Sequence, residues 1–127
     1  MAKLPKEAMD LFNDLQAIKV IATVDTLGKP NVAVKGSLMA IDDETIVYAE
    51  MAGGKTKANL EWTKQAAVIA CKGMTAYQVK GDFQGFKTSG DVFEQFSRQV
   101  KERLNLDVKN VGTIKIEEVY SRGKKIA

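Results

Sequence analysis

The order of β-rich segments along the chain is the feature that most limits its fold. Six short stretches are rich in β-branched residues or alternate between apolar and polar residues, and Gly, Pro and Asp turn signals separate them. They cover residues 18–24, 31–39, 45–49, 66–71, 75–83 and 111–119. Helical periodicity is confined to residues 5–17, residues 55–62 and a stretch from Ser89 to Leu104. Strands and helices do not alternate regularly, so we expect a mostly antiparallel β-barrel with flanking helices.

Two segments have especially clear patterns. In 75–83, Tyr77, Val79 and Phe83 fall on one face of a strand, and polar residues fall on the other. After Ser89, a candidate helix cap, apolar residues recur at helical spacing. We therefore predict a strand with one wet face, followed by an amphipathic helix.

The composition predicts a single domain over residues 1–127. The chain is 45% hydrophobic, which is enough for one core but short for two. Its first residues lack the apolar stretch of a signal peptide, and the longest apolar run, Ala66 to Cys71, is too short to span a bilayer. We therefore expect a cytoplasmic protein that does not insert into a membrane.

Residue usage excludes several kinds of chemistry. The chain has no histidine, which removes the usual ligands of zinc and haem and any histidine base, so no metal site is predicted. The single cysteine, Cys71, rules out an internal disulfide and lies in an apolar run where a thiol is usually inert. The net charge of +3 suits a small anionic ligand. Nucleic acid is not expected, because basic residues cluster only in the tail 122–125.

The segment Gly53-Gly54-Lys55-Thr56 has the chemistry of a phosphate site. Glycines let backbone N–H groups approach an anion, a following helix adds its positive N-terminal dipole, and Lys and Thr supply further donors. It is not a Walker A loop, because the position of that motif's first glycine is Ala49. The alternative is a plain turn followed by a solvated helix face, and the segment alone does not decide between the two.

A charge and a glycine also interrupt the apolar strand around Lys35-Gly36-Ser37, where local propensity favours neither. Close approach of a flat ligand to the backbone explains this pattern, and so does a bend at Gly36 with Lys35 in water. Trp62 and Tyr77 could stack on a ring, but core or interface packing is the favoured explanation for each.

The order and spacing of these motifs resemble the pyridoxamine 5'-phosphate oxidase-like family, the FMN-binding split barrels, over roughly residues 11–120. The resemblance rests on Ile21–Asp25 with Gly28–Val32, Lys35–Ser37, Gly53–Thr56 with Asn59-Leu60, and Tyr77–Gly81. It implies a six-stranded antiparallel split β-barrel, and FMN buried between the two subunits of a homodimer. It also implies that Val34, Lys35, Gly36 and Ser37 lie along the flavin ring, whereas Gly53, Gly54, Lys55, Thr56 and Asn59 hold the phosphate. The chain lacks the C-terminal extension that grips pyridoxal in the true oxidases, so oxidation of vitamin B6 is not expected.

Three readings of function follow from this resemblance and from the residues. The first is a small FMN-dependent oxidoreductase, in which Lys35 raises the potential of the flavin and no side-chain acid or base is required. The second is an FMN-binding electron carrier without a dedicated substrate, and its redox partner is left open. The third is a small basic barrel that binds nucleic acid or another protein and leaves the flavin groove empty. A related alternative is a split barrel that binds a deazaflavin or another anionic ligand.

Overall fold

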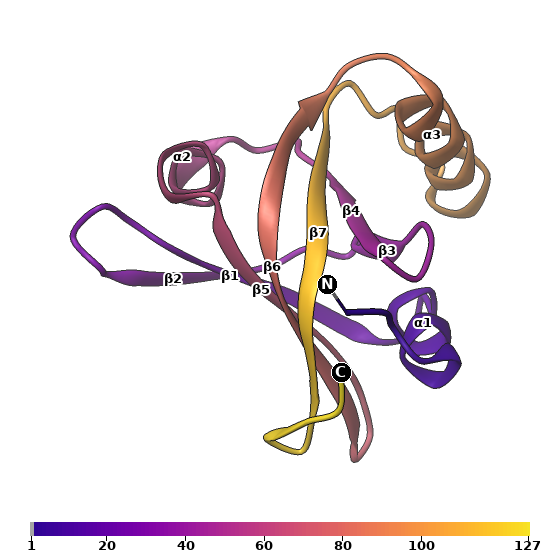
Figure 1. The fold of residues 1–127 in the computed structure, drawn as a ribbon. Coiled ribbons are helices and arrows are strands. Elements are labelled where there is room, and N and C mark those ends of the chain that lie inside the picture. Colours follow the sequence, from indigo (N-terminus) through magenta and orange to yellow (C-terminus); the bar gives the residue numbers. More distant parts are fainter. Residues whose placement is uncertain (1) are drawn as a thin grey trace.

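The computed structural model describes residues 2–127, in which the chain forms three helices and eight strands (Figure 1). The helices are α1 (Lys6–Phe12), α2 (Gly54–Thr63) and α3 (Asp91–Leu104). The strands are β1 (Ile18–Val24), β2 (Pro30–Val34), β3 (Met39–Ala40), β4 (Thr45–Ala49), β5 (Gln65–Lys72), β6 (Thr75–Lys87), β7 (Val111–Ser121) and β8 (Lys124–Lys125).

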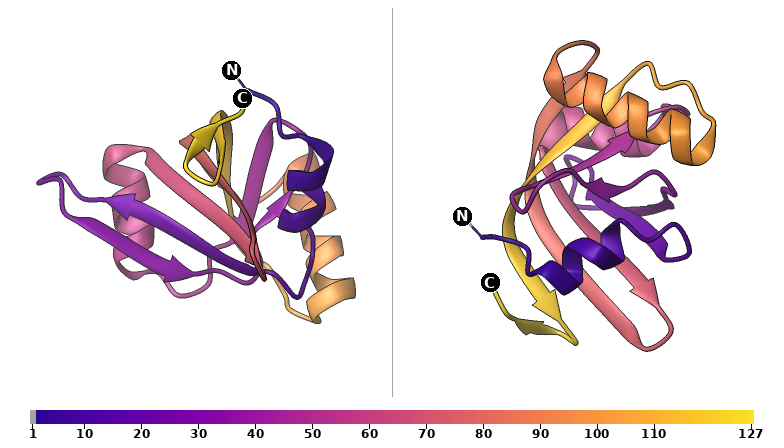
Figure 2. Two further views of the ribbon diagram at one scale, coloured as in Figure 1. Left: turned by 90° about the horizontal axis from the view of Figure 1, so that it is seen from below. Right: turned by 90° about the vertical axis from the view of Figure 1, so that its right-hand side faces the viewer.

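All strands pair antiparallel in one curled sheet with the order β2-β1-β5-β6-β7-β4-β3, and β8 pairs with β7. The β1–β2 hairpin projects from the sheet beside α2, and α1 and α3 lie toward the other side (Figures 1 and 2). The prediction of a mainly β, antiparallel fold with flanking helices is confirmed, and the curled sheet forms a half-barrel.

The predicted number of six strands is wrong. The segment 31–39 is not one strand, because the Leu38 N–H bonds to the Lys35 carbonyl and closes a turn between β2 and β3. The polar tail supplies the other additional strand, since Tyr120 pairs with Lys125. The first event has a local signal, the charge and the glycine at residues 35 and 36, whereas the pattern of the tail predicts only a polar end.

The predicted patterns of β6 and α3 are confirmed, with small changes at their ends. Val79 and Phe83 are buried and Tyr77 is half-buried, while Lys80 and Asp82 are exposed. Gly90, with φ of 96°, caps α3 in place of the predicted Ser89. The first helix ends at Phe12, five residues before the predicted end near residue 17. Asn13 leaves the helix because its side chain exchanges two hydrogen bonds with the Ala40 backbone, of 2.9 and 3.1 Å.

The core has two parts, each closed by a helix. The larger lies inside the curl of the sheet, where α1 contributes Ala8, Leu11 and Phe12. In the smaller, Phe96 and Val100 of α3 are completely buried against β3, β4 and the start of β7. Burial of these aromatic and aliphatic side chains fixes both helices on the sheet. No helix within residues 2–127 is long and apolar enough to cross a membrane.

Candidate functional site

The junction between β4 and α2 carries the predicted phosphate segment. Gly53 and Gly54 have φ of 69° and 79°, a backbone region that side chains other than glycine rarely adopt. The helix begins at Gly54, and no side chain caps it. Its first turn contains Lys55 and Lys57 and no acidic residue, whereas α3 begins with Asp91 and Glu94. The start of α2 is therefore the basic, uncapped helix terminus that suits an anion.

The Gly53 N–H is already in use. It donates to the Glu50 carboxylate at 2.7 Å, and the Tyr48 hydroxyl donates to the other oxygen of that carboxylate at 2.9 Å. Burial of the ring, followed by the nearby Glu50 charge, raises the pKa of Tyr48, so its hydroxyl stays protonated at physiological pH. An anion at this junction is thus left with the N–H groups of the first helical turn.

A cavity of about 410 Å³ joins the two segments that the sequence singled out. Val34, Lys35, Gly36 and Ser37 form one side, and residues 49, 51 and 52, directly before Gly53, form another. The Ser37 hydroxyl accepts a hydrogen bond of 2.9 Å from the Ala49 N–H, which ties the two sides together.

Distant parts of the chain complete this cavity. Leu15 comes from the α1–β1 loop, and Leu104 and Leu106 come from the end of α3 and the loop that follows. Sequence reasoning missed these three residues, because only the folded chain brings them beside the β2–β3 turn. The cavity is therefore lined mainly by apolar residues. Lys35 is a charged residue in its wall, and the Lys35 ammonium lies 5.7 Å from the centre of the Tyr48 ring.

The remaining predicted phosphate residues differ in their surroundings. Lys55 is exposed, with its ammonium 4.0 Å from the Asp25 carboxylate. Thr56 and Asn59 are buried and face the β1–β2 hairpin: Thr56 accepts from Asn31 at 3.4 Å, and Asn59 donates to Thr23 at 3.1 Å. The side chains of Thr56 and Asn59 therefore fasten α2 to the sheet, and their predicted contact with a phosphate stays a prediction.

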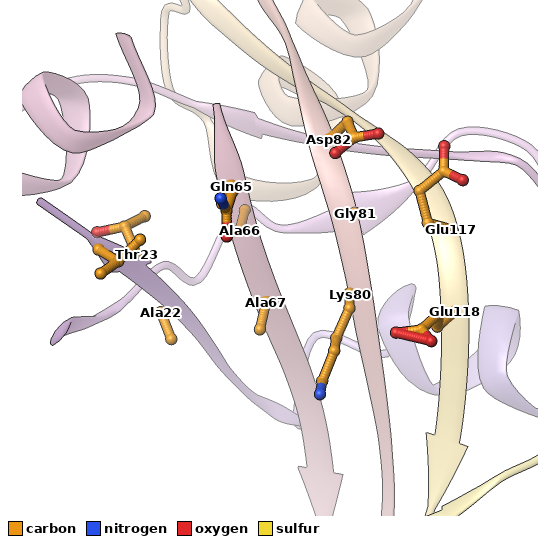
Figure 3. A pocket seen from close by; sticks show the side chains of 11 residues that line it. Ala22, Thr23, Gln65, Ala66, Ala67, Lys80, Gly81, Asp82, Glu117 and Glu118 are labelled. Carbon is orange, nitrogen blue, oxygen red and sulfur yellow. The ribbon is translucent and has the colours of Figure 1, made fainter. Parts of the chain in front are cut away.

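A second hollow, of about 480 Å³, lies on the sheet across β1, β5, β6 and β7 (Figure 3). Small residues form part of it, and Lys80, Asp82, Glu117 and Glu118 add charge. Three carboxylates against one ammonium make it a poor site for an anion. It contains none of the predicted site residues, and no group of three or more potential metal ligands occurs within the described chain.

One sheet face next to the first cavity carries exposed apolar side chains. Val20 pairs across the strands with Val34 on one side and with Ile69 on the other. Because paired residues share a face, these side chains form a continuous row. Ile18 and Val32 lie on the same face, and we call the five residues the apolar strip. Val34 and Val32 are 71% and 70% exposed, so much of the strip is open to solvent.

The curled antiparallel sheet with flanking helices defines the class to which the chain belongs, a half-barrel built around one sheet. Within that class, residues 4–123 match the family model described as pyridoxamine 5'-phosphate oxidase. The match spans most of the chain, which therefore belongs to the pyridoxamine 5'-phosphate oxidase family. The resemblance inferred from the sequence is confirmed.

Solved structures with this fold are similar along almost their whole length. HupZ from Group A Streptococcus is 26% identical, with 98% of this chain and 99% of that chain covered and a TM-score of 0.84. A protein from Lactobacillus delbrueckii, described as a candidate pyridoxamine 5'-phosphate oxidase, is 27% identical, with 93% of each chain covered and a TM-score of 0.75. An FMN-binding protein from Syntrophomonas wolfei is 24% identical, covering 92% of this chain and 84% of that chain, with a TM-score of 0.81. Among curated proteins, none matches this chain.

Proposed function

We propose that the chain binds FMN, with the flavin ring in the cavity beside the β2–β3 turn and the phosphate at the start of α2, and that it acts as a small oxidoreductase. The observation that carries this proposal is the continuity of the two features. The cavity is lined by residues 34–37 and by residues 49, 51 and 52, and the latter lead directly into Gly53 and Gly54. An elongated ligand with an apolar ring and an anionic end matches that arrangement.

The cavity has properties suited to a planar ring. Its volume of about 410 Å³ lies within the range of small-molecule sites, roughly 300–1,000 Å³. A Cβ atom at Gly36 would meet no atom within 4 Å, so the space over this backbone is open. Met51 is 59% exposed at the same cavity and offers an apolar, adaptable contact.

The start of α2 has properties suited to the phosphate. The N–H groups of its first turn point along the helix axis toward the Gly53–Gly54 junction, and the helix dipole adds partial positive charge there. Lys55 and Lys57 lie in the same turn, with their ammonium groups beside the Trp62 and Phe86 rings. Charge-assisted contacts of this kind recognise a phosphate monoester rather than a neutral sugar.

When bound, FMN would supply the redox chemistry of the site. The chain would bind and orient the cofactor and set the electrostatic environment of its ring. Among the described residues that line the cavity, Lys35 is the one with an ionisable side chain. A positive charge there favours ring states that carry negative charge, and no side-chain acid or base is needed.

A homodimer belongs to the same proposal. Burial of apolar area drives association, and the apolar strip leaves Val32, Val34 and Ile18 exposed on one face. Val34 belongs both to the strip and to the cavity wall. Pairing of two strips would therefore cover the cavity from one side and shield the ring from water.

The first experiment is the visible spectrum of the purified protein before and after addition of FMN, with the released cofactor identified by mass. We expect flavin absorption that saturates with FMN. A colourless protein that takes up no FMN would contradict the proposal, and uptake of a deazaflavin instead would identify the other ring system.

Variants locate the site. Lys55→Ala should weaken FMN binding by about tenfold or more, because a charge-assisted contact is worth roughly 1.5–3 kcal/mol. Gly36→Val should block the ring while leaving the fold intact, since its φ is not in the left-handed region and the added atoms have space. Lys109→Ala, at an exposed lysine that does not line the cavity, is the control.

Two further measurements test turnover and assembly. Reduction of the bound FMN by NADH or NADPH, with reoxidation in air, supports an oxidoreductase; reduction only by dithionite favours an electron carrier.

Sedimentation equilibrium should give twice the 13.9 kDa chain mass, and Val32→Asp should reduce the measured mass to that of one chain. A monomeric wild type would contradict the dimer.

A further inference from the structure

The buried carboxylate of Glu50 is a feature that the proposed function does not use. Glu50 is 7% exposed, follows the last residue of β4 and accepts hydrogen bonds from the Gly53 N–H and the Tyr48 hydroxyl. We propose that Glu50 is a positioning residue that holds the Gly53–Gly54 junction so that the first turn of α2 stays open to a phosphate group. The inference rests on the proposed function and deepens it.

The rest of the structure fixes Glu50 from behind. Its own N–H donates to the Asn110 carbonyl at 2.9 Å. Tyr48 is completely buried, and its ring lies directly against Gly112, where any Cβ atom would overlap it. Neither the Glu50 backbone nor the Tyr48 ring that supports its carboxylate can therefore move freely. Glu50 thus connects a rigid strand to a junction built from glycines.

The junction needs such a connection because glycines lose more conformational freedom on ordering than other residues. Gly53 and Gly54 both have positive φ, and no side chain caps the helix. The hydrogen bond from the Gly53 N–H to Glu50, at 2.7 Å, restricts the residue directly before the helix. It uses the N–H of the residue before the helix, so those of residues 54–56 are left for a ligand.

The charge of Glu50 acts in the opposite direction, because a carboxylate repels a phosphate. Its two hydrogen bonds spread and neutralise part of that charge, and the helix N-terminus and Lys55 add positive charge at the junction. Positioning is therefore expected to outweigh repulsion, and removal of the side chain is expected to weaken phosphate binding rather than strengthen it.

The same strand holds the ring side of the site. The Ala49 N–H, adjacent to Glu50, donates to Ser37, and the Lys35 ammonium lies over the Tyr48 ring. Both ends of the proposed ligand are thus placed relative to residues 48–50, which form the end of β4 and the residue directly after it. Loss of Glu50 should release the phosphate end and leave the ring end in place.

The experiment compares the affinities of FMN and riboflavin, which differ only by the phosphate, for wild type, Glu50→Ala, Glu50→Gln and the exposed control Glu102→Ala. We expect Glu50→Ala to lose about tenfold or more in FMN affinity, with riboflavin affinity unchanged. Glu50→Gln keeps one acceptor for the Gly53 N–H and should recover part of the loss. If Glu50→Ala binds FMN like the wild type, or loses both ligands equally, the inference is wrong.

A second measurement needs no flavin. Inorganic phosphate is titrated into the same proteins while the amide resonances of residues 54–56 are followed by NMR. We expect saturable shifts in wild type and Glu102→Ala and much weaker ones in Glu50→Ala, with Glu50→Gln as the variant to use if Glu50→Ala does not fold. Equal shifts in all proteins, or none in the wild type, would overturn the role of Glu50. A wild type that binds phosphate here but no FMN overturns only the proposed function.

Discussion

Replacement of Lys19 by methionine should stabilise the protein, although it removes a charge from a strand. Lys19 is 1% exposed, and its ammonium has no hydrogen-bond partner among the described residues. Burial, followed by repulsion from Arg103, lowers its pKa from the ordinary 10.5 to about 8, and only Asp14 opposes this. A fall of that size corresponds to roughly 3 kcal/mol by which folding disfavours the charged form. Methionine keeps most of the apolar stem, so we expect a gain of about 2–3 kcal/mol.

The pH dependence separates this cause from a general packing effect. The folded pKa lies below the unfolded one, so between about pH 8 and 10.5 the unfolded chain binds more protons and the wild-type free energy of unfolding rises with pH. The penalty is full below pH 8. The advantage of Lys19→Met should therefore be constant at pH 6–7 and shrink as the pH rises through that window.

Urea unfolding of wild type, Lys19→Met and the control Lys109→Met at several pH values measures this advantage. The control should differ little from wild type, because residue 109 is exposed. A Lys19→Met variant that is less stable than wild type at pH 7, or whose advantage does not change up to pH 10.5, would refute the reasoning.

Three other predictions concern single positions. Lys35→Met should lower the reduction potential of bound FMN by on the order of 20 mV, since up to about 1 kcal/mol is expected for a solvent-exposed charge, and a potentiometric titration that shows no decrease would contradict it. Gly81→Ala should cost about 1–3 kcal/mol of unfolding free energy in urea, because its Cβ would overlap the Lys115 carbonyl; full wild-type stability would show that the strands can separate at no cost. Asn13→Ala should cost a similar amount by removing both hydrogen bonds to Ala40, and a thermal midpoint equal to that of wild type would count against this account.

Local patterns in the sequence were enough to predict most elements of the fold. The alternation in β6 and the apolar stripe of α3 reflect one-sided burial, which leaves a periodic trace in the sequence. The turn at residues 35–38 and the β7–β8 hairpin are both closed by local hydrogen bonds, from the Leu38 N–H to the Lys35 carbonyl and between Tyr120 and Lys125. The number of strands was underestimated because the prediction made residues 31–39 one strand despite the break at Gly36, and residues 122–125 a plain polar tail.

The candidate site was predicted to a similar extent. The two segments around Gly36 and Gly53 were found because both break the local rules for strands and helices. Leu104 and Leu106 were not found, because apolar residues at the end of a helix look the same whether they line a cavity or a core. Glu50 did have a local signal, a carboxylate three residues before a helix-starting glycine pair, but its burial could come only from the structure.

The two edges of the sheet determine how copies of this chain can meet. One edge is β2, which begins with Pro30 and so lacks an N–H at its first residue, and the other is β3, with only two residues. Neither presents a long row of free backbone groups to which another strand could add, and such rows are what allow open-ended fibrous growth. A further copy is therefore directed away from the edges and toward the broad face of the sheet. In the proposed homodimer, contact through one shared patch on each copy would close upon itself after two chains, so the surface that held the partner would also limit how many copies could follow.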